Sequence, residues 1–289
     1  MAEQFPLRVQ LLSVPDCPLV EKVRSTLESC LTKAQIATVL EEVVGGYSSP
    51  TLLVDGFDVT GYPPPSDSQI SCRLDLPNEE QILAALRVLT VTKRGNALEE
   101  QIRAAAFRSL VNTGQRVAVD ALAAIIKAES GTVRDCVERI HQGGHLQLDS
   151  EGFIVGAVGL SISPTRHEIS IDGRRFWTWC ALDVLGVFGA LNASGFVKSS
   201  EPPSNNAITV EFVKGIPINP DVVVFLADLS TDTSVRCDWC PKVNFFSSRS
   251  SAESWVQANA ANGSIVSVDH LAPVAREAWS RLITAQIAP

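Results

Sequence analysis

One residue constrains this chain more than any other: Asp183 lies in the nearly apolar segment FWTWCALDVLGVFGAL, residues 176–191. The length and apolar content of this segment predict a buried helix. An unpaired carboxylate is costly to bury, so Asp183 needs a partner inside the fold. Cys180 precedes Asp183 by three residues, and on a helix such positions share a face. The segment therefore predicts a thiol and a carboxyl side by side in a buried place.

Spacing alone leaves two interpretations of this pair open. In the first, Cys180 is an ordinary buried core thiol and Asp183 caps a neighbouring backbone amide. In the second, the two groups belong to a reactive site. The chain has seven cysteines, an odd number that makes a poor disulfide framework. In a reducing compartment we expect such thiols to be buried, metal-binding or catalytic. The four histidines are scattered, which argues against a histidine-rich zinc site.

A second cysteine motif is the CDWC sequence from Cys237 to Cys240. Such a pair is half of a zinc site, a redox pair or a source of one soft ligand. No second pair of ligands with similar spacing accompanies it, which counts against structural zinc. A redox pair usually precedes a helix, whereas this one precedes VNFF, residues 243–246, a predicted strand. That position counts against the redox interpretation.

The order of predicted elements gives an α+β chain of three domains. Residues 1–92 form a small α/β domain, residues 93–156 a helical domain that ends in a hairpin, and residues 157–289 a mixed, strand-rich domain with an internal helix. A charged stretch with one glycine, residues 93–96, is the expected linker. The elements expected in the first domain are strands at 7–13, 36–44 and 52–56 and helices at 19–32 and 79–89. Those expected in the second are helices at 97–112, 117–128 and 132–142 and a hairpin at 145–156. Those expected in the third are strands at 167–173, 207–213 and 221–227 and helices at 176–191, 251–258 and 271–287.

Charge and hydropathy limit the partners. The net charge is −8, which argues against a nucleic acid, because a nucleic-acid partner favours a basic face. No stretch reaches the roughly 18 apolar residues of a membrane span, and the first residues, 1–6, show no basic run followed by an apolar core. We therefore expect a cytoplasmic protein with neither a nucleic-acid nor a membrane partner.

The run TRHEISIDGRRFWTWCALDVL, residues 165–185, resembles the core motif of the organomercurial (alkylmercury) lyases. In that family an I-D-x-R-R stretch leads into W-C-A-L-D, whose cysteine and aspartate are catalytic; these match Cys180 and Asp183. The family's second catalytic cysteine lies about sixty residues on, five before a Phe-Phe pair, and matches Cys240. The segment AESWVQANAANGSIVSVDHL, residues 252–271, also resembles the family, and the resemblance covers about residues 97–289. Cys237 is additional to the motif.

The resemblance implies a carbon–mercury lyase that uses no cofactor. Thiolates are the preferred ligands of a soft metal such as mercury. It implies that Cys180 and Cys240 hold the mercury of an organomercurial substrate, and that Asp183 takes a proton from a cysteine and delivers it to carbon. The products are a hydrocarbon and Hg²⁺ on the two cysteines. Low-molecular-weight thiols then remove the ion, and a mercuric reductase is the expected acceptor.

The first domain resembles a thioredoxin-like domain. Cys17 stands at the start of the predicted helix, and Ser49-Pro50-Thr51 resembles the cis-proline turn that faces the active cysteine of that fold. The run CPLV lacks the second cysteine of a CxxC pair, so dithiol reductase activity is not expected. Two interpretations stay open: Cys17, with Cys72, receives or delivers mercury, or the domain is a docking domain with buried cysteines.

Two other classes of function compete with the lyase. Three helices followed by a hairpin in residues 93–156 are typical of a winged helix, which together with the cysteines suits a metal-responsive regulator. Against DNA binding, the third helix reads TVRDCVERIHQ, residues 132–142, in which acidic residues offset the basic ones. The other alternative is a protein that binds mercury or another soft metal, with Cys237 as a further candidate ligand, and cleaves nothing.

Overall fold

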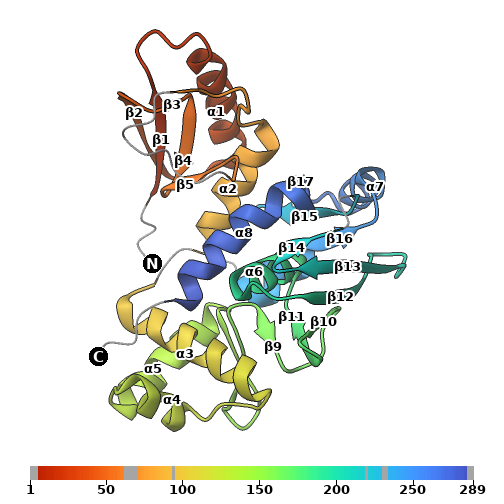
Figure 1. The fold of residues 1–289 in the computed structure, drawn as a ribbon. Helices are drawn as coiled ribbons and strands as arrows, with labels where there is room; N and C mark the ends of the chain where they lie inside the picture. Colours follow the sequence, from red (N-terminus) through yellow and green to blue (C-terminus); the bar gives the residue numbers. More distant parts are fainter. Residues whose placement is uncertain (1–5, 62–70, 93–94, 219–220, 230–233, 285–289) are drawn as a thin grey trace. The chain divides into compact units, whose positions relative to one another are not determined.

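The computed structural model describes residues 6–61, 71–92, 95–218, 221–229 and 234–284 (Figure 1). It divides into two compact units, residues 1–91 and 92–289. The proline-rich stretch 63–66, the first half of the expected linker at 93–96 and the end of the helix expected to reach residue 287 lie outside the described residues.

The first unit is built on a four-stranded sheet with the order β2-β1-β4-β5. Its strand β1 runs parallel to β2 and antiparallel to β4. Buried residues alternate with more exposed ones in the first half of β1, and all of the last three residues are buried, which fits the apolar sequence LRVQLLS. Helix α2 packs on β1, β4 and helix α1. A separate parallel pair joins β3 to β6. The elements are β1 (Leu7–Ser13), α1 (Val20–Ala34), β2 (Thr38–Val44), β3 (Ser48–Ser49), β4 (Thr51–Val54), β5 (Phe57–Asp58), β6 (Ser71–Cys72) and α2 (Glu79–Val91).

The two helices and three strands expected for this unit are present in the expected order, and three further two-residue strands, β3, β5 and β6, lie among them. The Ser49–Pro50 peptide bond is cis. The assignment of the unit to the thioredoxin-like class stays a prediction.

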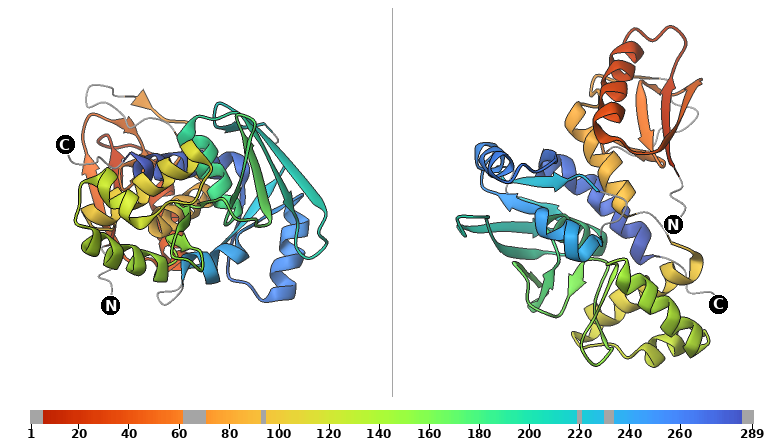
Figure 2. Two further views of the ribbon diagram at one scale, coloured as in Figure 1. Left: turned by 90° about the horizontal axis from the view of Figure 1, so that it is seen from below. Right: turned by 180° about the vertical axis from the view of Figure 1, so that it is seen from behind.

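The second unit begins with three helices and a hairpin, which gather at one end of the unit (Figure 2). Asn96 caps the first helix by accepting a hydrogen bond from the Glu99 amide, and Gly114 ends that helix in a left-handed conformation. Helix α3 also packs on strand β8 and on helix α8 further along the chain. The elements are α3 (Ala97–Thr113), α4 (Val119–Ile126), α5 (Ser130–Gln142), β7 (Leu146–Leu148) and β8 (Ile154–Ala157). The predicted helices and hairpin are therefore present, and the winged-helix assignment stays a prediction.

An eight-stranded antiparallel sheet continues from this hairpin, with the order β14-β13-β12-β10-β11-β9-β8-β7. Strand β13 alternates buried and exposed residues, as expected where one face of a sheet is covered. The remaining strands of this sheet are β9 (Leu160–Ser161), β10 (His167–Ile171), β11 (Arg174–Thr178), β12 (Gly195–Ser200), β13 (Ala207–Val213) and β14 (Ile216–Pro217).

A second, three-stranded sheet has the order β16-β15-β17 and packs on helix α7. All residues of its central strand are buried, which accounts for the continuous apolar run VVFLA. A π-turn and a short 3-10 turn lead into β16. The elements are β15 (Val223–Ala227), η1 (Val235–Trp239), η2 (Cys240–Lys242), β16 (Asn244–Phe246), α7 (Arg249–Asn259) and β17 (Gly263–Ser267).

Two helices, α6 (Ala181–Leu191) and α8 (Val268–Ile283), lie side by side in the second unit (Figure 1). Glycines let their backbones approach closely. A Cβ atom at Gly186 would lie 2.1 Å from Cδ2 of Trp279, and one at Gly189 would lie 2.7 Å from Cβ of Arg276. Helix α6 is buried along almost its whole length, as its nearly all-apolar sequence predicts.

The predicted extent of this helix is wrong at its start. The helix was expected from residue 176, but the Phe176–Thr178 part of the segment belongs to strand β11, and the helix begins at Ala181. Periodicity does not separate a buried strand from a buried helix in a short apolar run, and a strand rich in aromatic residues fits the sequence FWT equally well.

Among the described residues, no helix is both long enough and apolar enough to cross a bilayer.

Candidate active site

Cys180 lies at the junction between strand β11 and helix α6, where it is the residue that caps the helix in an extended conformation. Its neighbours fix the junction. The Trp179 amide donates to the Gly159 carbonyl (3.0 Å), the Ala181 amide donates to the Val243 carbonyl (3.1 Å), and the Thr178 hydroxyl donates to the Cys180 carbonyl (3.1 Å). The thiol is fully buried. Three segments of the chain therefore hold Cys180 in one place.

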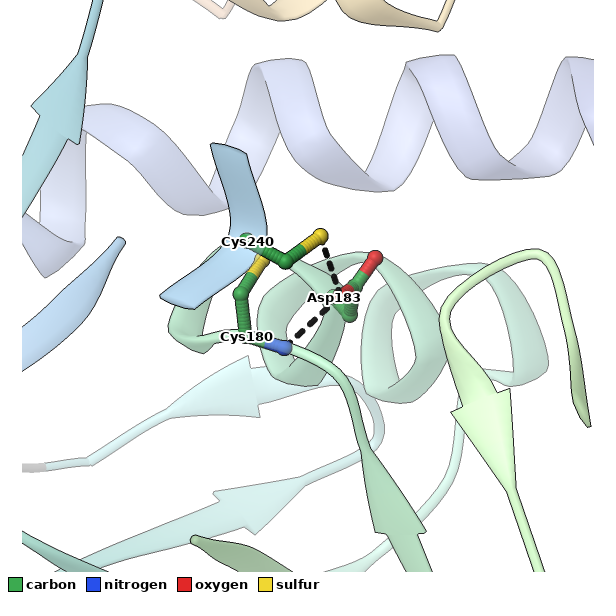
Figure 3. Close-up of side chains that lie close together, drawn as sticks. All are labelled: Cys180, Asp183 and Cys240. Carbon is green, nitrogen blue, oxygen red and sulfur yellow. Dashed lines mark hydrogen bonds between the residues drawn. The ribbon is translucent and has the colours of Figure 1, made fainter. Parts of the chain in front are cut away.

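Asp183 stands in the first turn of helix α6, and its carboxylate Oδ2 accepts a hydrogen bond from the Cys180 amide at 2.9 Å (Figure 3). This is the position at which an acidic side chain satisfies an otherwise free amide at a helix N-terminus. Only 5% of Asp183 is exposed. Asp183 thus caps a neighbouring backbone amide, which was one of the two interpretations that spacing alone left open. The same hydrogen bond places the Asp183 carboxyl beside the Cys180 thiol.

Cys240 comes from a distant part of the chain, the 3-10 turn before strand β16. The indole Nε1–H of the preceding residue, Trp239, donates to the Ala227 carbonyl at 3.0 Å and anchors the turn to strand β15. The Cys240 thiol points toward Asp183, with Sγ 4.0 Å from Oδ2 (Figure 3). Ligand atoms of Cys180, Asp183 and Cys240 all lie within 4.8 Å of one another, and all three residues are buried.

The environment of the three groups favours their neutral forms. Burial raises the pKa of the Asp183 carboxyl to about 7, although the hydrogen bonds from Cys180 lower it. Burial, the contact with Cys240 and the charge of Asp183 raise the pKa of the Cys180 thiol well above its usual value. The contact with Cys180 lowers the pKa of Cys240, but burial and the Asp183 charge outweigh that contact, so this pKa is raised too. Near neutral pH the carboxyl can therefore both take up and give up a proton.

A tight turn between strands β8 and β9 covers the carboxyl. A Cβ atom at Gly159 would lie only 2.1 Å from Oδ1 of Asp183, so hydrogen alone fits at this position. The indole Nε1–H of Trp279 in helix α8 donates to the Val158 carbonyl at 2.9 Å and holds the turn. Both turn residues have positive φ, 52° at Val158 and 82° at Gly159. Sequence inspection missed Gly159 and Trp279; an isolated glycine and an isolated tryptophan carry no signal of their own.

The other thiols named from sequence lie apart from this group. Cys237 is exposed on the π-turn, three residues before Cys240. Cys17 and Cys72 belong to the first unit, where Cys17 is half-buried and Cys72 is exposed. The Ser49 hydroxyl contacts Cys17, and Ser49 is also the register partner of Cys72 between β3 and β6. These two cysteines therefore flank one serine.

Arg174 and Arg175, which precede Cys180 in strand β11, differ in their contacts. The Arg174 guanidinium donates to the carbonyls of Val111 and Asn112 at the end of helix α3 (2.8 and 3.0 Å). It thus ties strand β11 to that helix. The Arg175 guanidinium instead lies over the Trp177 ring.

Two thiols and one carboxyl, buried and convergent, form the kind of site that suits a soft metal ion with an acid–base group beside it. Comparison with known proteins finds one family that resembles this part of the chain. Residues 160–280 match the family model described as alkylmercury lyase. All three residues of the site fall inside this range.

Three proteins named alkylmercury lyase illustrate the relationship. The one from Staphylococcus epidermidis is 32% identical over 135 residues, which are 45% of this chain and 62% of that protein. The one from Bacillus cereus is 32% identical over 130 residues, 43% of this chain and 57% of the relative. The one from Streptomyces lividans is 28% identical over 151 residues, 51% of this chain and 68% of the relative. The chain thus spans about three fifths of the length of the first two relatives.

The fold has a solved counterpart. The crystal structure of the mercury-bound form of MerB2 superposes with a TM-score of 0.61 at 22% identity, and covers 70% of this chain and 97% of that one. Residues 160–280 are therefore similar in sequence to the alkylmercury lyases, and 70% of the chain has a fold similar to that of MerB2.

Proposed function

We propose that this protein is an organomercurial lyase, which splits the carbon–mercury bond of R–Hg⁺ by protonolysis. The observation that carries the proposal is the convergence of two buried thiols and one buried carboxyl within 4.8 Å. The alkylmercury lyases that resemble residues 160–280 support it. The substrate class is organomercurial, and the reaction uses no bound cofactor.

In the first step one thiol, Cys180 or Cys240, binds mercury, and its proton leaves with the displaced ligand of R–Hg⁺. The second thiol then passes its proton to the Asp183 carboxylate as its sulfur also binds the metal. The raised pKa of Asp183, about 7, suits a group that accepts this proton and gives it up again. Two thiolates on mercury push electron density onto the metal and weaken its bond to carbon.

In the second step the protonated Asp183 delivers its proton to the carbon atom. The carbon–mercury bond breaks, the pair of electrons stays with carbon, and the hydrocarbon R–H leaves. Hg²⁺ remains on Cys180 and Cys240, and Asp183 is again a carboxylate. Exclusion of water protects this sequence, because every group involved is at most 5% exposed. Low-molecular-weight thiols then remove the ion, and a mercuric reductase is the proposed acceptor.

We assign the helical segment at the start of the second unit a structural role rather than DNA binding. Arg134 of helix α5 pairs with Asp120 (2.9 Å), and Arg139 lies near Glu99 (3.8 Å), so acidic neighbours offset the cations that phosphate contacts would need. Helix α3 packs on β8, whose following turn covers Asp183. A salt-sensitive mobility shift with duplex DNA would contradict this assignment.

Release of benzene from phenylmercury by the purified, thiol-reduced protein tests the proposed function. We expect the wild type to release benzene and the Cys180→Ala and Asp183→Ala variants to release none above the buffer rate. Cys136→Ala is the matched control, because Cys136 is a buried thiol of helix α5 outside the site. Binding of one mercurial per chain without benzene release would instead indicate a mercury-binding protein.

A further inference from the structure

The π-turn before strand β16 connects the buried site to the surface. Cys240, at its end, is only 2% exposed, whereas Cys237, three residues earlier, is exposed. Only two residues separate the two cysteines along this turn, and the charge of Cys237 acts on the Cys240 thiol. The chain thus offers a second thiol that reaches solvent beside the thiol that reaches Asp183.

This turn is held in place. The Asp238 amide donates to the Ser234 carbonyl (2.9 Å), and the Asp238 carboxylate accepts from the Ser234 amide (2.9 Å). The Val235 amide donates to the Gly143 carbonyl (3.2 Å). Gly144 lies so close that a Cβ atom there would come within 2.5 Å of the Ser234 hydroxyl. The position of Cys237 relative to Cys240 is therefore fixed by the fold.

Arg236, between these anchors, adds a positive charge at the same place. Its charge acts on Cys240, and its Nε atom is buried with no hydrogen-bond partner in the described part of the chain. A buried N–H without a partner is costly, so it favours an anionic group beside it. Thiolates gathered around a metal ion supply such a group.

The proposed reaction leaves its product in a place that external thiols do not reach. Cys180, one of the two sulfurs on the product, is fully buried, and Cys240 is nearly so. Removal of Hg²⁺ by an external thiol therefore needs an intermediate ligand that contacts both the site and solvent. Of the thiols in the described part of the second unit, Cys237 alone is exposed.

We propose that Cys237 is an exit ligand, which takes Hg²⁺ together with Cys240 as Cys180 lets it go; this inference rests on the proposed lyase function. In the exchange the Cys237–mercury bond forms and the Cys180–mercury bond breaks, while the proton of the Cys237 thiol passes to the Cys180 sulfur. No electron is transferred. An external thiol then attacks mercury on the exposed Cys237 side, and its proton goes to the displaced sulfur.

Extraction of inorganic mercury tests the exit ligand without any need for carbon–mercury cleavage. The full-length chain, with Cys17 and Cys72 changed to serine so that the first unit contributes no thiol at these positions, is loaded with one equivalent of HgCl₂. It is then mixed rapidly with excess low-molecular-weight thiol, and the mercury left on the protein is measured over time. We expect Cys237→Ser and Cys237→Ala to slow extraction at least about tenfold, because the ion must leave from buried sulfurs.

The matched control is Asp238→Asn, which removes the negative charge beside Cys237 but keeps both thiols and an oxygen that can accept the Ser234 amide hydrogen bond. We expect extraction from this variant at the rate of the parent chain. Extraction from both Cys237 variants within twofold of the parent, or equal slowing by Asp238→Asn, would overturn the exit-ligand proposal. Failure of the wild type to release benzene from phenylmercury would refute the lyase function instead. The extraction experiment would still test the exit ligand, because it uses inorganic mercury and needs no carbon–mercury cleavage.

Discussion

The carboxyl of Asp183 lies against the α-carbon of Gly159, so closely that a methyl group at residue 159 would sit 2.1 Å from Oδ1. The same carboxyl receives the Cys180 amide on its other oxygen. Asp183 is thus held from two sides, by the start of its own helix and by the turn between β8 and β9. In the proposed reaction this arrangement aims the proton donor and keeps water away from it.

Gly159→Ala should abolish most of the cleavage. The new methyl group must push Asp183 away from Cys180 and Cys240, and displacement of a reacting group by about 1 Å costs roughly 100-fold in rate. Single-turnover release of benzene from phenylmercury measures the effect. We expect binding of the mercurial to persist, because both thiols remain.

Gly152→Ala is the control for this change. Gly152 has nearly the same positive φ, 83° against 82°, but nothing lies within 4 Å of its missing Cβ. It reports the backbone strain alone, about 1–2 kcal/mol. Equal loss of cleavage in the two variants would refute the contact with Asp183 as the cause.

Trp279→Phe should weaken the turn that covers the carboxyl. The substitution removes the Nε1–H donor of the Val158 carbonyl and leaves a buried acceptor without its partner, which costs about 1–3 kcal/mol. Val158 is β-branched and has a φ of 52°, so the turn depends on such anchors. Urea unfolding measures the stability, and benzene release measures the effect on cleavage.

The control for this change is Trp255→Phe, because Trp255 packs against Phe225 and Phe246 away from this turn. Cleavage by Trp279→Phe at the rate of Trp255→Phe would contradict a role for the turn.

Asp183 should contribute less to the stability of the protein as the pH rises toward 7, and this loss should appear as a difference between the wild type and Asp183→Asn. The pKa of Asp183 is about 7 in the folded chain against 3.8 as its usual value, so the folded state binds the proton more tightly than the unfolded state. Ionisation of the buried carboxyl then costs stability progressively between pH 4 and 7. At about 1.4 kcal/mol per pKa unit, we expect the wild type to lose about 2 kcal/mol relative to Asp183→Asn between pH 5 and pH 7. Urea titrations at the two pH values measure this difference; parallel pH profiles would contradict a raised pKa.

In the first unit, Cys17 should be the thiol that binds mercury. Burial raises its pKa slightly, but hydrogen bonds from the Ser49 hydroxyl and the amides of Leu19 and Val20 outweigh burial and lower the pKa below its usual value. Titration with Hg²⁺ of the full chain carrying Cys180→Ala, Cys237→Ala and Cys240→Ala should find one tightly bound ion.

Cys17→Ser in this background should remove that tight binding, and Cys30→Ser should not. Cys30 is fully buried in helix α1, and burial raises its pKa to about 11. Absence of tight, thiol-dependent binding before the Cys17 change would leave the first unit without a role in mercury transfer.

The sequence predicted much of the local structure but not the contacts that complete the site. Strand 7–13 and the helix over 97–112 follow from periodicity and capping residues that act within a few positions. The pairing of Cys180 with Asp183 follows from their spacing, although Cys180 caps the helix rather than lying within it. The wrong start of the helix at residue 176 has a physical cause, since a buried strand and a buried helix have the same apolar composition.

Long-range contacts explain the remainder. The approach of Cys240 to Asp183 joins positions 57 residues apart, and it was indicated by family resemblance, not by spacing. The contact between Gly159 and Asp183 depends on how a turn of one sheet packs on a helix start. No local pattern around either residue encodes that packing.

The most direct test of the proposed chemistry is a single turnover of phenylmercury in D₂O, in which benzene and protein-bound mercury are measured in the same sample. We expect one monodeuterated benzene per chain from the wild type, with mercury retained on the protein. We expect no benzene from Asp183→Asn, with intact phenylmercury bound. Benzene release by Asp183→Asn at the wild-type rate would contradict the role of Asp183 as proton donor, and intact phenylmercury on the wild type would contradict the lyase itself.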